Sequence, residues 1–431
     1  MKFFLAVIFL SISFVSNCLA NDVIFFLESA YINNPKLKAE RENLKAIKEN
    51  INISKSDFLP SVTITGSIDS SESTNRTDQS GNSLADISNE TETTSVSVDQ
   101  KIFQGFEGYN SVKKSKLEVK RASLQLKKIE QEVILETATA YYDLEYKIKS
   151  KDFNLNNVDL FERQVESDKA RSQKGEISLT DLSQSESSLA GAYADFIAAE
   201  NDLLTAKTNF ERITRISVPD QIDENLKYDI LLPKNLNDSL QLSEKNNPDL
   251  IIAKLNYEIS KKDVSIEKAK LSPSASLNYS RSSNDDFSAT VDELEKESVK
   301  ATVTWPLLKG GKNFSSLKKA KFTKNKNGLI LDDKTNETKT NTANAWSLYQ
   351  SAQSVLKSTE AQVKAAEIAN EGITLEYDSG NTRTTLEVIQ SRSLLLNARI
   401  ANAKAKRDFM VSKFKLLSVI GQLSLEKVQN P

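Results

Sequence analysis

Hydrophobic positions along this chain follow a two-residue period in four short segments. In the first segment Val62, Ile64 and Ile68 alternate with threonine, serine and aspartate. Strict alternation predicts strands with one apolar and one polar face. The four predicted strands lie near residues 60–70, 92–103, 273–283 and 298–307. Each is about ten residues long, which suits a tilted strand that crosses a bilayer.

An ordinary antiparallel sheet with one wet face would show the same alternation. The segments between the paired strands, residues 71–91 and 283–297, bear on this choice because they are polar and acidic. We predict both as long loops, which are typical of the outward side of a membrane barrel. The loops therefore favour membrane strands over a soluble sheet.

The rest of the chain is predicted to be helical. Residues 22–57 and 236–270 form a short helical segment in each half, and much longer segments run from Glu107 to about Ser172 and from about Asn313 to Tyr377. About 65 residues at ~1.5 Å each make a rod of roughly 100 Å. The first rod carries apolar residues at steps of three and four, which predicts a coiled-coil seam: Val119, Ala122, Leu126, Ile129 and Val133.

Several landmarks occur twice. The sequence Asn33-Asn34-Pro35 returns as Asn246-Asn247-Pro248, and Gly105 and Gly175 have counterparts at Gly310 and Gly380. A repeat of this length indicates a duplicated domain. We predict a signal peptide at 1–20, a first structural repeat at 21–214, a linker at 215–235 and a second repeat at 236–431.

The first residues resemble an export signal, with Lys2 before an apolar run and the small-residue site Cys18-Leu19-Ala20. Removing such a signal removes the chain's only cysteine. The chain has no histidine, which excludes Ser-His-Asp catalysis and most zinc sites. A net charge of −2 does not favour a nucleic-acid surface. We therefore expect no enzyme, no cofactor and no nucleic-acid partner.

Four strands cannot close a barrel, and an open sheet edge in lipid leaves unpaired N–H and C=O groups at several kcal/mol each. Identical chains must then share one barrel. Two chains would give eight strands and a filled interior, whereas three would give twelve strands and leave a lumen. The geometry predicts a tube built from several copies.

With these elements in order, the chain resembles the TolC-type outer-membrane efflux protein family. The resemblance covers essentially the whole predicted mature chain and rests on Asn-Asn-Pro followed by Leu59-Pro60, and on the tip segments 174–181 and 380–388. It implies a mixed α+β membrane protein. In that fold a trimeric, twelve-stranded outer-membrane β-barrel, with four strands per chain, is continued by a long α-helical coiled-coil tunnel in the periplasm of a Gram-negative bacterium.

The resemblance also implies a function and partners. The chain would be the outer-membrane exit duct of a tripartite efflux or type I secretion system, passing drugs, small molecules or proteins. It would form a homotrimer in outer-membrane lipid and work with a periplasmic adaptor and an inner-membrane RND, MFS or ABC transporter. The main alternative is a structural periplasmic or surface coiled-coil protein without a channel.

Candidate site residues follow from the same resemblance. The family closes its tunnel at the periplasmic tip, and the matching gate positions are Asp181, Tyr377 and Arg383. The matching pore constriction is Glu387 and Gln390, of which only Glu387 is charged. The alternative for all five is a solvated helix tip.

Two other motifs are assigned to structure. Gly310-Gly311-Lys312 does not fit a phosphate-binding loop, because Pro306 and Asn313 occupy two of its required positions. The aromatic residues at matching places in the two long helices are predicted to be core residues: Tyr141, Tyr142 and Trp346.

Overall fold

The fold is described from a computed structural model, which describes residues 23–218, 231–288, 291–379 and 383–429. The predicted signal peptide, much of the predicted linker and Gly380 lie outside these residues. The chain divides into two compact units. We call residues 1–38, 129–247 and 339–431 the hairpin unit, and residues 39–128 and 248–338 the sheet unit.

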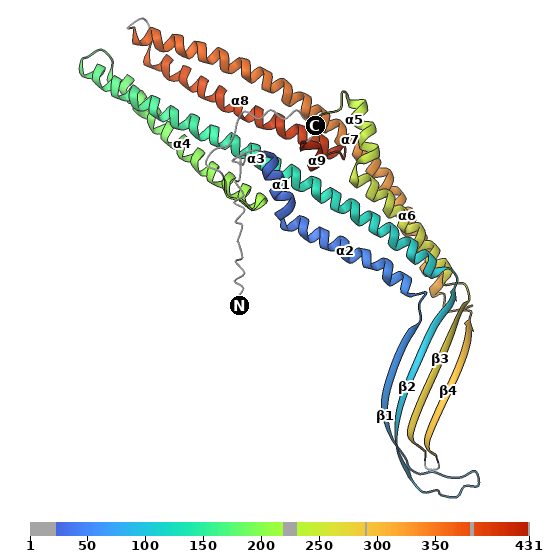
Figure 1. Cartoon of the computed structure of the whole chain (residues 1–431). Coiled ribbons are helices and arrows are strands. Elements are labelled where there is room, and N and C mark those ends of the chain that lie inside the picture. The colour runs from blue at the N-terminus through green and yellow to red at the C-terminus, as the bar shows by residue number, and fades with distance from the viewer. Residues whose placement is uncertain (1–22, 219–230, 289–290, 380–382, 430–431) are drawn as a thin grey trace, which may run out of the picture. The chain divides into compact units, whose positions relative to one another are not determined.

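One order of elements occurs twice along the chain (Figure 1). The first set is α1 (Val23–Asn33), α2 (Pro35–Ser56), β1 (Ser61–Ser73), β2 (Ile87–Gln104), α3 (Glu107–Gln173) and α4 (Leu179–Thr214). The second set is α5 (Leu236–Asn246), α6 (Pro248–Ala269), β3 (Ser274–Ser288), β4 (Val291–Thr304), α7 (Lys312–Asp378) and α8 (Thr385–Val419), followed by α9 (Leu425–Gln429). Both long helices have 67 residues, which confirms the predicted rods.

The short helical segment of each half is two helices, not the single one predicted. The break falls at Asn34 and Asn247, directly before a proline that starts the next helix. Proline suits the first helical position because its missing N–H is not needed there. Asn34 Nδ2 donates to the Ile213 carbonyl at 3.3 Å, and Asn247 Nδ2 donates to the Val419 carbonyl at 2.8 Å. Each asparagine thus ties its break to the end of a return helix.

The sheet is antiparallel in the order β1-β2-β3-β4. Its register places directly paired residues on one face: Val62 pairs with Val98, Val98 with Tyr279, and Tyr279 with Val299. The apolar face of the sheet comprises Val62, Ile64, Val96, Val98, Leu277, Tyr279, Val299, Ala301 and Val303. The polar face comprises Ser61, Thr63, Ser97, Asp99, Ser276, Asn278, Ser298, Lys300 and Thr302.

The predicted loop 283–297 is wrong over most of its length, and the predicted loop 71–91 is wrong at its two ends. The strands extend into both segments, so that residues 74–86 and 289–290 lie between the strands of each pair. Backbone pairing needs no apolar side chain, so a ladder can extend into water where alternation stops. Cross-strand contacts support the extension: Arg281 Nη2 lies 3.2 Å from Glu295 Oε2, and Tyr279 donates its hydroxyl hydrogen to Glu297 at 2.9 Å.

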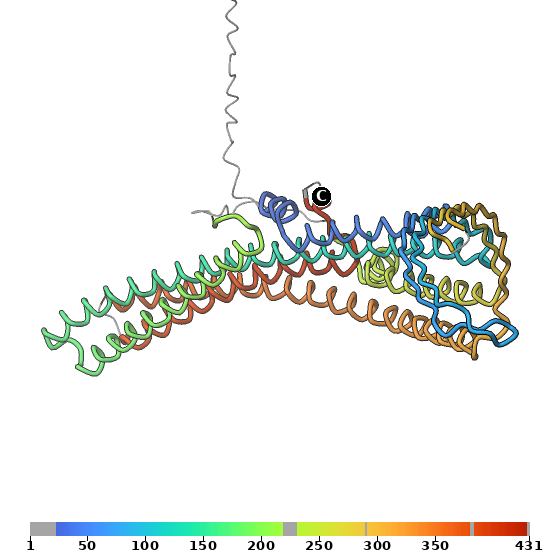
Figure 2. The backbone as a smooth tube through the Cα atoms, turned by 90° about the horizontal axis from the view of Figure 1, so that it is seen from below, coloured from blue at the N-terminus to red at the C-terminus, as the bar shows by residue number. Residues whose placement is uncertain are grey.

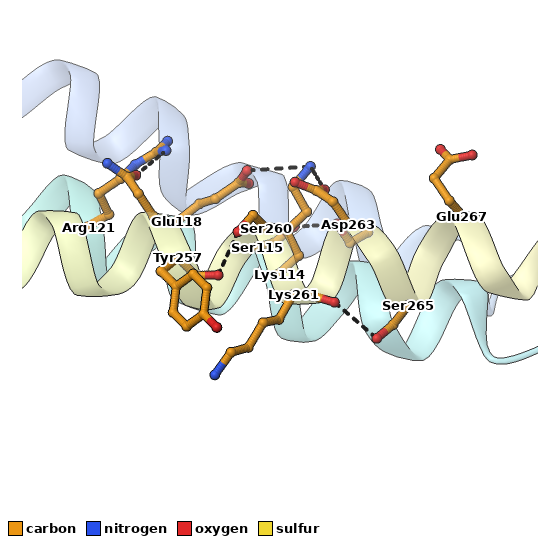
Figure 3. A network of polar contacts seen from close by, with 12 residues as sticks. Lys114, Ser115, Glu118, Arg121, Tyr257, Ser260, Lys261, Asp263, Ser265 and Glu267 are labelled. Atoms are coloured by element: carbon orange, nitrogen blue, oxygen red, sulfur yellow. Dashed lines mark hydrogen bonds and ion pairs between the residues drawn. The ribbon is translucent and has the colours of Figure 1, made fainter. Parts of the chain in front are cut away.

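Polar contacts join the helices of the sheet unit (Figure 3). Lys114 on α3 turns toward Asp263 on α6, with Nζ 2.8 Å from Oδ1, and it also lies 3.8 Å from Glu118. Ser115 on α3 shares a hydrogen bond of 2.6 Å with Ser54 on α2. These contacts fix how α3 is rotated beside its neighbours, and so which of its lysines face outward.

The main core lies in the hairpin unit, where aromatic rings meet. Phe26 packs edge-on against Phe210 with centroids 4.9 Å apart, and Tyr142 lies 6.1 Å from Phe414. Tyr141 and Tyr142 are buried in this cluster, and Trp346 packs against it. The prediction that these three aromatics are core residues is confirmed.

Two helical hairpins leave this core. The distal part of α3 runs beside α4, and the distal part of α7 runs beside α8 (Figures 1 and 2). Val158 and Phe161 of α3 pack with Ala192 of α4 and Ile389 of α8, which brings the two hairpins together. Among the described residues, no helix has a stretch long and apolar enough to span a membrane.

Candidate functional site at the hairpin tip

Both return helices begin with the same device at the tip. Ser178 and Asp181 form a capping box at the start of α4, with Asp181 N–H to Ser178 Oγ and Ser178 N–H to Asp181 Oδ2 both at 3.1 Å. Thr384 and Glu387 repeat it at α8, where Thr384 N–H donates to Glu387 Oε2 at 2.8 Å. A capping box satisfies backbone N–H groups that a helix start leaves free. Asp181 and Glu387 therefore both have a local structural task.

A buried hydrogen-bond chain joins all four helices at the tip. The Asp168 carboxylate on α3 is fully buried, and Tyr377 on α7 is only 6% exposed. Tyr377 donates its hydroxyl hydrogen to Asp168 Oδ1 at 3.0 Å, and its oxygen lies 3.1 Å from Thr385 Oγ1 on α8. Ser185 on α4 donates to Asp168 Oδ2 at 2.5 Å. Gln164, one turn earlier on α3, donates to Oδ1 at 3.0 Å.

Two arginines complete the surroundings of Tyr377. The Arg171 guanidinium lies 4.7 Å from the centre of the Tyr377 ring, a cation–π distance. Arg392 on α8 donates to the Leu160 carbonyl on α3 at 3.3 Å, and burial lowers its pKa. Burial also raises the pKa of the Tyr377 hydroxyl, and the bond to Asp168 acts in the same direction. Tyr377 is therefore held neutral, as a donor.

Arg383 lies at the tip of the hairpin of α7 and α8. Its Nε donates to Glu376 Oε2 at 2.6 Å, and its Nη1 donates to Glu387 Oε1 at 3.0 Å. The Thr384 backbone N–H and Arg383 together lower the pKa of Glu387, so this carboxylate stays charged. Gln390 is exposed one turn further along α8.

The three predicted gate residues lie together at the tip. Asp181, Tyr377 and Arg383 all line one cavity at the tip, with Arg171 on its wall. The carboxylate that Tyr377 contacts is that of Asp168, while Asp181 bonds within its own turn. The roles proposed for Asp181, Tyr377, Arg383, Glu387 and Gln390 stay predictions.

Asp168 was missed by the sequence analysis, although the sequence carries a signal for it. It follows Val158, Phe161 and Val165 at steps of three and four, so a carboxylate occupies a seam position of the coiled coil. Charged residues in such positions need partners and are rarely accidental. Residues outside positions 1–22, 219–230, 289–290, 380–382 and 430–431 contain no cluster of ligands that could hold a metal ion.

A four-stranded sheet with one apolar face, joined to two long helical hairpins, defines the class of a membrane channel protomer. The family described as outer membrane efflux protein matches residues 26–214 and 239–422. The chain belongs to this family.

Named relatives agree with this assignment. The chain is 25% identical to the outer membrane efflux protein BepC of Brucella suis, over 93% of this chain and 86% of that protein. It is 23% identical to the outer membrane protein TolC of Vibrio cholerae, over 92% of this chain and 90% of that protein. Among solved structures, the CmeC outer membrane channel of Campylobacter jejuni superposes with a TM-score of 0.81 at 14% identity, covering 94% of this chain and 88% of that one.

These comparisons confirm the expected family and the expected fold of the chain, a four-stranded antiparallel sheet continued by long helical hairpins. They also confirm the expected location, in the outer membrane of a Gram-negative bacterium and extending into the periplasm.

Proposed function

We propose that this chain is the outer-membrane exit duct of a tripartite efflux or type I secretion system. The observation that carries the proposal is the four-stranded sheet with one apolar face and two open edges. Among the residues that the structure describes, β1 pairs only with β2, and β4 pairs only with β3. Open edges are not tolerated in lipid, so β4 of one chain must pair with β1 of the next. Three chains then form a twelve-stranded barrel with a lumen.

The polar face of the sheet supports a water-filled interior. Along β3, Ser276, Asn278 and Ser280 alternate with Ala275, Leu277 and Tyr279. Asn278 Nδ2 donates to Asp99 Oδ1 at 2.7 Å, and the Ser280 and Ser298 hydroxyls lie 2.9 Å apart. Barrels that conduct have polar side chains inside and apolar ones toward lipid.

We infer that the hairpin tip is the periplasmic gate of this duct. Asp181, Tyr377 and Arg383 line one cavity there, and the Tyr377–Asp168 bond joins the hairpin of α7 and α8 to the hairpin of α3 and α4. Opening the duct requires the hairpins to move apart, which breaks contacts specific to the closed state. Asp168 is therefore added to the proposed gate.

Glu387 is proposed as a carboxylate of the pore constriction, with Gln390 one turn further along α8. Three copies in a trimer would place three negative charges around one narrow lumen, which would concentrate cations. The depressed pKa of Glu387 keeps these charges in place at neutral pH.

The proposed partners are two further copies of the chain, outer-membrane lipid, a periplasmic adaptor and an inner-membrane RND, MFS or ABC transporter. The cargo is proposed as drugs, small molecules or proteins, chosen mainly by the pump. The chain is inferred to be a conduit and not an enzyme, and no nucleic-acid partner or cofactor is assigned to it.

A reconstitution experiment tests this function. The purified chain in planar bilayers should conduct ions as a trimer, and its deletion should sensitise the native cell to pump substrates or stop secretion of a large protein. A structural periplasmic protein would instead be released by osmotic shock without detergent. A monodisperse monomer with intact strands and no conductance would contradict the proposal.

A further inference from the structure

The starts of the two long helices carry the same exposed side-chain pattern. On α3 an aromatic residue is followed by lysines four and seven positions later, Tyr109, Lys113 and Lys116. On α7 the pattern recurs as Phe314, Lys318 and Lys321. Positions i, i+4 and i+7 lie on one helix face. All six side chains are exposed, Tyr109 to 53% and Phe314 to 59%.

These four exposed lysines differ from Lys114, which makes contacts inside the sheet unit. Lys114 is paired with Asp263 and Glu118 and turns toward α6 (Figure 3). Within the part of the chain that the structure describes, Lys113, Lys116, Lys318 and Lys321 take part in no ion pair, and Lys113 Nζ lies 4.2 Å from the centre of the Tyr109 ring. Between Trp305 and Asp332, α7 and its lead-in contain seven lysines and no acidic residue. The outward charge is therefore uncompensated within the chain.

The apolar face of the sheet leads directly into these helix starts. The end of this face that is far from the helices is marked by the ion pair between Arg281 and Glu295. The end that is near the helices reaches the exposed residues Trp305, Leu307 and Leu308. β4 ends at Thr304, and the Leu307 N–H bonds to the Trp305 carbonyl at 3.0 Å, so the exposed apolar residues continue past the strand into the turn that leads to α7. The edge of the apolar membrane band nearest the helices is therefore placed at Trp305, Leu307 and Leu308.

The apolar face of the sheet also continues into the start of α3. Phe103 pairs with Ala275, which pairs with Val303 on the apolar face. The Phe103 ring packs edge-on against Phe106 at 5.7 Å, and Phe106 is 68% exposed. Tyr109 follows within one turn. Aromatic rings collect at the level of lipid headgroups, so Tyr109 and Phe314 are placed to sit there.

The lysines then fall at the depth of the lipid phosphates. Four helical residues advance about 6 Å, and the headgroup layer is about 5–7 Å thick on each side. Lysine side chains extend along apolar surface and carry their ammonium group back to the polar layer. Anionic headgroups attract such lysines within a Debye length of about 10 Å.

We propose that Tyr109, Lys113 and Lys116, with Phe314, Lys318 and Lys321, form a binding surface for anionic phospholipid headgroups on the periplasmic side of the outer membrane. The inference rests on the membrane barrel of the proposed function and names the lipid that the barrel selects. The lysines bind the phosphodiester, and the aromatic rings hold the glycerol and upper acyl region. Each chain carries two such sets, one on α3 and one on α7, so a trimer carries six.

The test compares lipid retention by the purified trimer in a non-ionic detergent. The trimer is offered equal amounts of phosphatidylglycerol, phosphatidylethanolamine and lipid A, and retained lipids are counted by native mass spectrometry. The unmodified protein should prefer phosphatidylglycerol. The variant with Lys113→Gln, Lys116→Gln, Lys318→Gln and Lys321→Gln should bind it at least about tenfold more weakly, since each lysine near a charged surface contributes about fivefold.

A matched control removes four exposed lysines elsewhere: Lys357→Gln, Lys364→Gln, Lys404→Gln and Lys406→Gln. Lys357 lies roughly 60 Å further along α7 than Lys318. This control changes the net charge by the same amount as the first variant, and it should retain as much phosphatidylglycerol as the unmodified protein. The pair Tyr109→Ala and Phe314→Ala should weaken binding of phosphatidylglycerol and phosphatidylethanolamine alike, because it removes the apolar part of the surface.

Conductance in neutral bilayers is recorded for every variant, so that loss of the barrel is recognised separately. Unchanged phosphatidylglycerol retention in the first variant would overturn the proposal, as would an equal loss in the lysine control. A preference for lipid A over phosphatidylglycerol would also overturn it. If the unmodified chain formed no channel, the proposed function would fail and this inference with it.

Discussion

The Tyr377 hydroxyl donates a hydrogen bond of 3.0 Å to the Asp168 carboxylate, across 209 positions of sequence. The bond joins the hairpin of α7 and α8 to the hairpin of α3 and α4. Because Asp168 is fully buried, water does not weaken this hydrogen bond as it would weaken a contact on the surface. At Tyr377 the two hairpins are connected by this bond and by Arg171 over the tyrosine ring, and not by a contact of Asp181.

Asp168→Leu should open the tip. The change leaves the Tyr377 and Ser185 hydroxyls without their acceptor, at roughly 1–3 kcal/mol for each buried polar group. We expect larger single-channel conductance in planar bilayers, with trimer yield unchanged. The matched control is Asp159→Leu, on the same helix but exposed and paired only with Arg163. Equal conductance of both variants and the parent would remove Asp168 from the gate.

Tyr377→Phe combined with Arg383→Ser should have a larger effect than either change alone. The pair removes the buried link and the surface links of Arg383 to Glu376 and Glu387. A surface ion pair contributes only about 0–1 kcal/mol, so Arg383→Ser alone should change little. The measurement is conductance together with sensitivity of cells to antibiotics of vancomycin size. Asp181→Ala should act in the same direction but more weakly. A double variant that conducts like the parent would place the gate elsewhere.

The apolar face of the sheet predicts position-dependent tolerance of charge. Ile64→Arg or Val303→Arg should cost roughly 2–4 kcal/mol near the middle of the bilayer. Thr63→Arg and Thr304→Arg, on the opposite face, should cost much less. Urea unfolding of the trimer in detergent or lipid measures the difference. Equal costs on both faces would contradict a barrel with lipid outside and water inside.

Low pH should loosen the start of α8. The pKa of Glu387 is lowered in the folded chain, mainly by the Thr384 backbone N–H and then by Arg383. Because its pKa is lowered on folding, this carboxylate stabilises the fold at any pH above its ordinary pKa of about 4.3. The stabilisation is lost as the pH falls through the lower pKa of the folded chain. Conductance should therefore rise below about pH 4 in the parent. Glu387→Gln should remove this step, and a step that persists in that variant would belong to another group.

Charge in the proposed constriction should set ion selectivity. Glu387→Gln should reduce cation preference and weaken block by multivalent cations, because three negative charges leave the lumen. Gln390→Glu should strengthen both effects. Reversal potentials in asymmetric salt provide the measurement. If neither variant shifts them, these side chains do not face the pore.

Local sequence determined the elements and their order. The two-residue and 3.6-residue periods are properties of neighbouring side chains, so the strands and the two rods could be recognised without tertiary contacts. The proline after each asparagine fixed where α2 and α6 begin, and Gly421 is required since a Cβ there would lie 2.1 Å from the Asn246 carbonyl oxygen. The ends of β2 and β3 could not be predicted, because backbone pairing continues beyond the apolar alternation.

Tertiary structure decided which side chains meet. Asp181 and Tyr377 could be selected from the sequence, but the partner of Tyr377 depends on how α3 and α7 are rotated about their axes. The rotation of α3 is set by packing of Val158 and Phe161 against Ile389 of α8, which lies far from them in the sequence. A rotation of one residue, about 100°, would turn Asp168 out of the core. The sequence therefore determined the two rods and the face of each strand, while only the packed structure could assign the buried carboxylate at the tip.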